Sequence, residues 1–111
     1  GLGDVYKRQV KVRTGLAFEI PAGYYGALHI RSGISTSGPL MLANGVAVID
    51  SDYRGELKVP MVNLGAEAYT IQPGERVAQL CIAPVYTAAF VPAEELGDTQ
   101  RGVGGFGSTG K

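Results

Sequence analysis

The chain has 111 residues with 10 Lys and Arg and 10 Asp and Glu, so its formal net charge is zero. This balance gives no electrostatic basis for binding nucleic acid or an anionic membrane surface. A chain of this size forms one small domain with a modest core, for which oligomerisation is a common source of stability. No apolar run is long enough to span a bilayer, and no secretory leader is expected.

The first nine residues stand apart from the rest of the sequence. Gly1–Gln9 lacks the alternation of apolar and polar residues that a half-buried strand requires. Asp4–Gln9 also matches one reading frame of a transposon end that is widely used to prepare sequencing libraries. Our hypothesis is that residues 1–9 are a non-native, adapter-derived segment.

From Val10 to residue 97 the sequence is typical of an all-β domain. Alternating apolar residues from Val10 to Ile20 predict a strand with a bulge at Gly15, and a second strand is expected over Tyr24–Ile30. Turns rich in Gly, Asn, Asp and Pro separate the remaining apolar runs. These runs are Pro39–Ala43, Val46–Ile49, Glu56–Leu64, Tyr69–Ile71 and Val77–Val85. Many short strands at this spacing predict a small distorted barrel or jelly roll.

Three further expectations follow from single residues in this domain. Pro60 cannot donate to a ladder, so its strand should be an edge strand or carry a bulge. Pro92–Leu96 could form one helical turn. Cys81, the only cysteine, excludes an internal disulfide and suits a reducing compartment such as the cytoplasm; its apolar neighbours predict that it is buried.

The last residues, 98–111, form a glycine-rich arm in which other side chains carry chemistry. Glycine lets backbone N–H groups approach an anion closely, and Ser108 and Thr109 add hydroxyl donors. Arg101 offers a guanidinium suited to phosphate, and Phe106 offers a flat face for a base. These residues predict an arm that covers a nucleotide. A disordered glycine-rich tail is the alternative reading of composition alone.

Four segments in a fixed order resemble motifs two to five of the homotrimeric dUTP diphosphatases (dUTPases). They are Arg31–Gly33, Asn44–Gly55, Gly74–Gln79 and Arg101–Gly110, and the resemblance runs from Val10 to the end of the chain. It implies the dUTPase β-clip fold with an extended arm and a homotrimer with shared active sites. The implied reaction converts dUTP to dUMP and pyrophosphate, which limits uracil in DNA and supplies dUMP for thymidylate synthesis.

The resemblance assigns the reaction and the choice of sugar to two residues that follow one strand. Asp50 would be the general base that activates water for attack on the α-phosphorus. Without the other motifs, Asp50 would be read as a residue that caps a turn. Tyr53 would lie flat against the deoxyribose and leave no room for a 2′-hydroxyl. Asp52 is expected to be a turn residue only.

The resemblance also assigns the contacts to the base and to the phosphates. Asn44 opens the hairpin whose backbone around Val48 would read uracil, and Ala47 stands where the family usually has glycine, so the pocket is expected to be tighter or shifted. Phe106 would stack on uracil. The residues that would hold or close over the phosphates are Arg31, Ser32, Gly33, Gln79, Arg101, Gly107, Ser108 and Thr109.

The resemblance implies Mg²⁺ as the cofactor, bound through the triphosphate and water, as expected of a hard ion that keeps its hydration shell. No residue cluster in the sequence has the spacing of a metal cage. The role of the family's first motif is not transferred to Asp4, which lies too close to Thr14 in the sequence. Glu75 and Arg76 are expected to fix a turn and a neighbouring chain. We expect the arm to be mobile without nucleotide and ordered with it.

Two other functions remain open at this stage. A dCTP deaminase-like relative would need a catalytic glutamate in the barrel, for which Glu56–Leu64 offers only Glu56. A non-catalytic or regulatory trimer, in a phage for example, would keep the fold and bind nucleotide without turnover. The pair of Asp50 and Tyr53 favours dUTP hydrolysis over both.

Overall fold

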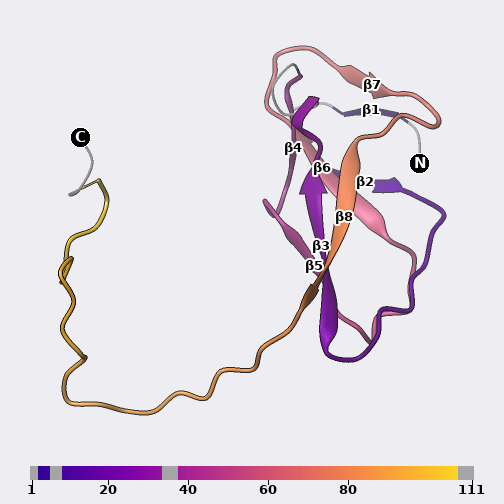
Figure 1. Ribbon diagram of the computed structural model, residues 1–111. Helices are drawn as coiled ribbons and strands as arrows, with labels where there is room; N and C mark the ends of the chain where they lie inside the picture. Colours follow the sequence, from indigo (N-terminus) through magenta and orange to yellow (C-terminus); the bar gives the residue numbers. More distant parts are fainter. Residues whose placement is uncertain (1–2, 6–8, 34–37, 108–111) are drawn as a thin grey trace.

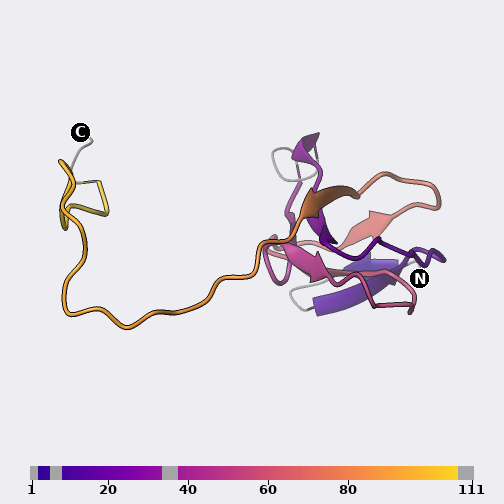
Figure 2. The same cartoon turned by 60° about the horizontal axis from the view of Figure 1, so that its bottom comes forward.

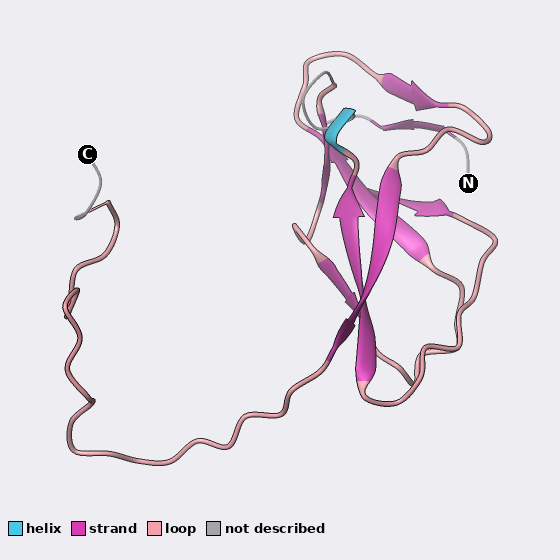
Figure 3. Ribbon diagram, in the orientation of Figure 1, coloured by secondary structure: helices cyan, strands magenta, loops and turns pink. Residues whose placement is uncertain are grey.

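A computed structural model describes residues 3–5, 9–33 and 38–107 of the chain (Figures 1 and 3). The described part is built from strands, with a helical turn only at Ser32 and Gly33. The strands are β1 (Gly3–Val5), β2 (Gln9–Arg13), β3 (Tyr24–Ile30), β4 (Leu40–Leu42), β5 (Ala47–Ile49), β6 (Lys58–Asn63), β7 (Tyr69–Ile71) and β8 (Ala78–Pro84). The all-β prediction is therefore confirmed.

The strands form three small antiparallel sheets (Figure 1). One sheet has the order β2-β6-β4, the second β5-β3-β8, and β1 pairs with β7. Partners in each three-stranded sheet are far apart in sequence, so each sheet joins the two halves of the domain. The sheets do not close on each other, and the architecture is an open, jelly-roll-like arrangement.

The core lies where the inward faces of these sheets meet. Alternation puts Val59, Met61 and Asn63 of β6 inside, while Lys58 stays at the surface. Leu28 of β3 and Leu40 of β4 are 2% and 0% exposed and belong to the same cluster. Side chains from separate sheets thus share one core, which holds the open sheets together.

Pro60 marks neither an edge nor a bulge, which corrects the prediction, because β6 is the central strand of its sheet and pairs with β2 in continuous register through Pro60. The Pro60 carbonyl accepts a hydrogen bond from the Ala43 N–H at 2.8 Å. The proline nitrogen faces the same neighbour, at the point where β4 has already ended at Leu42. The missing N–H therefore falls just beyond the ladder, where it removes little pairing.

Two predicted elements do not form. Residues 14–20 contain no strand. Gly15 has a positive φ of 73°, which interrupts the extended backbone after β2. The segment is instead held by single hydrogen bonds, such as the one that the Leu16 carbonyl accepts from the Leu57 N–H at 2.8 Å. Pro92–Leu96 forms no helical turn. This segment is exposed, and a helix of one turn without packing is not stable.

Two other expectations also fail. Within Gly1–Gln9, the segment Gly3–Val5 forms strand β1 on β7, because backbone pairing does not require alternating side chains. Cys81 is exposed. It lies on β8, the edge strand of its sheet, where it is opposite Ala27 and adjacent to the inward-facing Leu80. An apolar run on an edge strand is covered less completely than one on a central strand.

Beyond Pro84 the chain leaves the sheets as a long extended segment, and the predicted arm, which starts at residue 98, is the last part of it (Figures 1 and 2). Tyr86 and Phe90 are 89% and 97% exposed. The radius of gyration is 18.7 Å, against about 13 Å for a compact chain of about 100 residues. None of the described residues belongs to a helix long and apolar enough to cross a membrane.

The core assignment predicts different effects for two methionines on neighbouring strands. Met61 is 0% exposed and Met41 is 39% exposed. We expect Met61→Ala to lower the free energy of unfolding by about 2–5 kcal/mol, because it leaves a cavity. Met41→Ala, the control, should cost less than about 1 kcal/mol. Urea denaturation at one protein concentration measures both, and equal losses would contradict this core.

Candidate functional site

Asp50 and Tyr53 open and close a tight turn after β5. The Tyr53 N–H donates to the Asp50 carbonyl at 3.1 Å, and the Asp50 side chain is exposed. Both residues line a cavity of about 380 Å³ that also includes Val48, the middle residue of β5. Lys11 and Lys58 line the same cavity and supply positive charge. The predicted base and the predicted sugar platform therefore share one pocket.

The Tyr53 ring is held in place by its own turn. Its hydroxyl donates to the Glu56 carbonyl at 2.8 Å. The ring lies so close to residue 55 that a Cβ on Gly55 would be 2.5 Å from the hydroxyl oxygen. A side chain at position 55 would therefore displace the ring of Tyr53, and Tyr53 remains 45% exposed toward the cavity.

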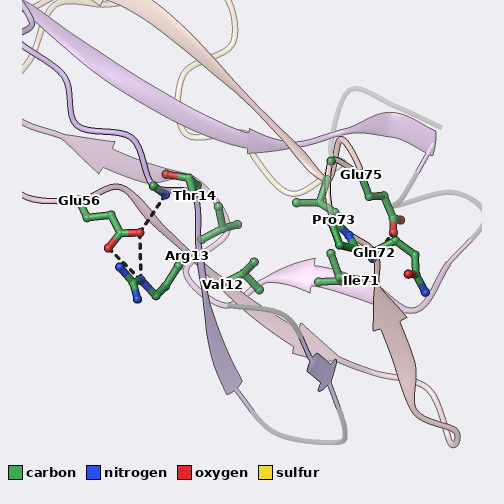
Figure 4. A pocket seen from close by; sticks show the side chains of 12 residues that line it. Val12, Arg13, Thr14, Glu56, Ile71, Gln72, Pro73 and Glu75 are labelled. Atoms are coloured by element: carbon green, nitrogen blue, oxygen red, sulfur yellow. Dashed lines mark hydrogen bonds and ion pairs between the residues drawn. The ribbon is translucent and has the colours of Figure 1, made fainter.

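The ionised carboxylate of Glu56 holds this part of the chain against residues 13–15 (Figure 4). Its carboxylate accepts from the Arg13 Nε at 3.1 Å and from the Gly15 N–H at 2.9 Å. The Gly15 amide, and then Arg13, hold the pKa of Glu56 below its usual value. Because the carboxylate is occupied by these donors, it is poorly suited to the proton transfers of a deaminase.

Arg31 and Gln79 both line a second cavity of about 420 Å³. Antiparallel pairing of β3 and β8 sets His29 opposite Gln79, which carries Arg31 to the same end of the sheet. The Arg31 Nη1 donates to the Arg76 carbonyl at 3.3 Å. The structure thus brings the two predicted phosphate-binding segments together.

Glu75 fixes the turn between β7 and β8, as predicted (Figure 4). Its carboxylate accepts from the Gln72 N–H at 3.0 Å and from the Tyr69 hydroxyl at 3.0 Å. The hydrogen bond to Glu75, together with partial burial, raises the pKa of Tyr69 above its usual value. This turn positions the start of β8 and therefore Gln79.

The remaining predicted site residues lie outside these two cavities. Asn44 lies in the turn before β5, and Ser32 and Gly33 follow Arg31 at the surface. On the arm, Arg101 donates to the Gly104 carbonyl, and Phe106 is exposed with a φ of 49° next to the exposed Gly107. Ser108 and Thr109 lie outside the described residues.

Ala47 does not narrow the cavity, which corrects the expectation placed on its methyl group. Ala47 is 6% exposed and packs in the core, opposite Leu28 of β3. Alternation along β5 directs the next residue, Val48, to the other face, where it is 62% exposed. The methyl group of Ala47, which glycine would lack, therefore packs in the core and not in the cavity.

The described residues contain no group of three or more His, Cys, Asp or Glu arranged to hold a metal ion. The charged groups of the first cavity are instead two lysines, Asp50 and the anchored Glu56. The two lysines can position a polyanion and Asp50 can accept one proton, which are the requirements of a phosphoanhydride hydrolysis.

Comparison with known proteins gives consistent matches. Residues 5–110 match the family model described as dUTPase. The deoxyuridine 5′-triphosphate nucleotidohydrolase of Desulfitobacterium hafniense is 50% identical over 102 residues, covering 91% of this chain and 68% of that protein. That of Bdellovibrio bacteriovorus is 52% identical over 100 residues, covering 90% and 67%. A mutant dUTPase of Staphylococcus bacteriophage 80alpha with dUpNHpp has a TM-score of 0.84 at 27% identity, covering 99% and 81%.

The lowered pKa of Glu56 predicts a pH dependence of stability. The unfolded chain binds a proton at Glu56 at higher pH than the folded chain does, so this carboxylate stabilises the fold above the usual glutamate pKa of 4.5. That contribution should be lost as the pH falls below this value. As the pH falls, the urea midpoint should decrease less in Glu56→Gln than in the exposed control Glu67→Gln. Identical pH profiles for the two variants would contradict this role of Glu56.

Proposed function

Because the chain belongs to the dUTPase family, we infer that it hydrolyses dUTP to dUMP and pyrophosphate. One observation carries the assignment in the structure: Asp50 and Tyr53 line one cavity at the two ends of a single tight turn. Hydrolysis lowers the dUTP that a DNA polymerase could incorporate and yields dUMP for thymidylate synthesis. The chain spans about two thirds of the length of the bacterial relatives that it matches.

In this proposal Asp50 is the general base. Its exposed carboxylate accepts a proton from a water molecule, and the oxygen attacks the α-phosphorus in line with the departing bridging oxygen. The bond from the α-phosphorus to that bridging oxygen breaks, and pyrophosphate leaves with the electron pair. The exposed position of Asp50 at the cavity supports this role, because both water and substrate can reach it.

Tyr53 and the hairpin before it would select the nucleotide. The ring of Tyr53 would lie against the deoxyribose and exclude a 2′-hydroxyl by contact. Asn44 and the backbone around Val48 would read the uracil edge, with no space for a thymine methyl. The fixed ring over Gly55 supports this assignment, since steric selection requires a wall that does not move.

The phosphates would be held by Arg31, Ser32, Gly33 and Gln79 from the body, and by residues of the arm. Arg31 and Gln79 line a different cavity from Asp50 and Tyr53. This separation supports an active site that is assembled from several chains, as in the homotrimer we propose. The exposed aromatic residues of the extended segment after Pro84 support the same arrangement, because a neighbouring chain could cover them.

Enzymes of this family use a divalent metal ion, and the ion proposed here is Mg²⁺. A hard cation that keeps part of its water shell binds readily to triphosphate oxygens. When bound there, it neutralises charge that develops on the phosphates during the reaction. The chain's own groups would complement it: Arg31 and Gln79 orient the phosphates, and Asp50 removes the proton.

We further propose that the chain has three parts. Residues 10–97 form the body, residues 98–111 form the nucleotide-covering arm, and residues 1–9 are of foreign origin. Genomic reads across the Gln9 junction test the last point, which native codons there would refute. A cytoplasmic location fits a nucleotide substrate and the single free cysteine.

Substitution of Asp50 tests the proposed reaction. Asp50→Asn should lower pyrophosphate release from dUTP by about 10²–10⁴-fold, the usual contribution of a general base. Binding of a non-hydrolysable dUTP analogue should persist. Asp52→Asn, in the same turn, is the control and should retain turnover. Release from dCTP, dTTP and UTP should be far slower than from dUTP; turnover of dUTP by Asp50→Asn at the wild-type rate would reject this base.

The arm is tested by limited proteolysis. Its exposed residues should be cut readily without nucleotide and be protected by a non-hydrolysable dUTP analogue with Mg²⁺, because ordering the arm requires contacts with the ligand. Phe106→Ala should weaken the protection by removing a stacking contact, which is usually worth about 1–3 kcal/mol. Equal cleavage with and without the analogue would contradict a nucleotide-covering arm.

A further inference from the structure

The peptide group between Glu56 and Leu57 is held from both sides. Its carbonyl accepts the hydroxyl of Tyr53 at 2.8 Å, and its N–H donates to the Leu16 carbonyl at 2.8 Å. A peptide group is planar and rigid, so its two ends cannot turn independently. The direction of the hydrogen bond to Tyr53 therefore depends on how residues 56 and 57 dock on the segment around Leu16.

Three further contacts fix that docking. The carboxylate of Glu56 accepts from Arg13 at 3.1 and 3.2 Å and from the Gly15 N–H at 2.9 Å (Figure 4). The Thr14 hydroxyl donates to the Leu57 carbonyl at 2.7 Å. Leu57 itself is 6% exposed and belongs to the core. Tyr53 is thus connected to the core through the dipeptide of Glu56 and Leu57, which these hydrogen bonds hold in place.

We propose that Glu56, anchored by Arg13 and Gly15, is a positioning residue that fixes the ring of Tyr53 and thereby the discrimination between dUTP and UTP. The inference rests on the proposed contact of Tyr53 with the sugar. A ribose differs from deoxyribose by one oxygen, so a small displacement of the ring would make room for it. Gly55 contributes by letting the ring lie across the backbone.

The geometry distinguishes this role from a catalytic one. The carboxylate of Glu56 is directed to Arg13 and Gly15, at and just beyond the end of β2. It reaches Tyr53 only through its backbone carbonyl. Loss of the contacts to Arg13 and Gly15 should therefore change the choice of sugar, and the turnover number for dUTP should change little.

A double-mutant cycle on Glu56→Gln and Tyr53→Phe tests the connection. The measured quantity is kcat/KM for dUTP divided by kcat/KM for UTP. Each single substitution should lower this ratio by about fivefold, the equivalent of one neutral hydrogen bond. The double variant should lose no more than either single variant, because both changes break one chain of contacts. Additive losses, or an unchanged ratio in Glu56→Gln, would overturn the proposal.

Two further variants separate positioning from general damage. Arg13→Met removes the ion pair from a side chain that is 68% exposed, so it should fold normally and lower the ratio as Glu56→Gln does. Glu67→Gln removes the same charge from an exposed loop and should leave the ratio unchanged. A ratio that falls equally in Glu67→Gln would assign the effect to net charge and overturn the proposal.

The position of the ring gives a readout that does not depend on turnover. In crystal structures of Glu56→Gln and Arg13→Met, the ring of Tyr53 should shift or lose its bond to the carbonyl of residue 56. An unmoved ring in both variants would overturn the positioning role. Failure of the unsubstituted protein to hydrolyse dUTP would instead reject the proposed function, and the crystal structures would still decide the positioning role.

Discussion

The constraint on which this structure depends is the docking of residues 56 and 57 onto residues 13–16. On the inner side, it carries Leu57 into the core between the sheets. On the outer side, it sets the carbonyl that receives the Tyr53 hydroxyl. The segment around Thr14 is irregular, yet its hydrogen bonds to residues 56 and 57 join the end of β2 to the start of β6. Stability and the geometry of the site therefore share a small group of contacts.

The strand content and much of the site could be predicted from the sequence because they depend on local patterns. Short apolar runs bounded by turns, such as Tyr24–Ile30, give strand positions directly, and Asp50 follows an apolar run that ends at a turn. Pro60 and Cys81 could not be placed in this way. The cost of a missing N–H, or the burial of a thiol, depends on which strand lies alongside, and sheet order is a property of long-range pairing.

The positions of Lys11, Lys58 and Glu56 at the first cavity could not be predicted from the sequence either. Lys11 alternates with Val10 and Val12, which places it on an outer face of its strand. The local sequence does not show that Asp50 lies near that face. Arg13 and Glu56 are 43 positions apart and meet only because β2 pairs with β6. Sequence motifs thus indicate the residues that react, whereas the residues that position those groups are identified only from the three-dimensional structure.

The exposed segment after Pro84 has a consequence for newly synthesised chains. Tyr86, Phe90 and Val91 are uncovered in the single chain, at 89%, 97% and 82% exposure. Uncovered apolar side chains on an extended segment are what chaperones and proteases recognise in incompletely assembled proteins. In the proposed homotrimer, the supply of partner chains would then govern how long a newly made chain survives, so cellular quality control would match the amount of this protein to its assembly.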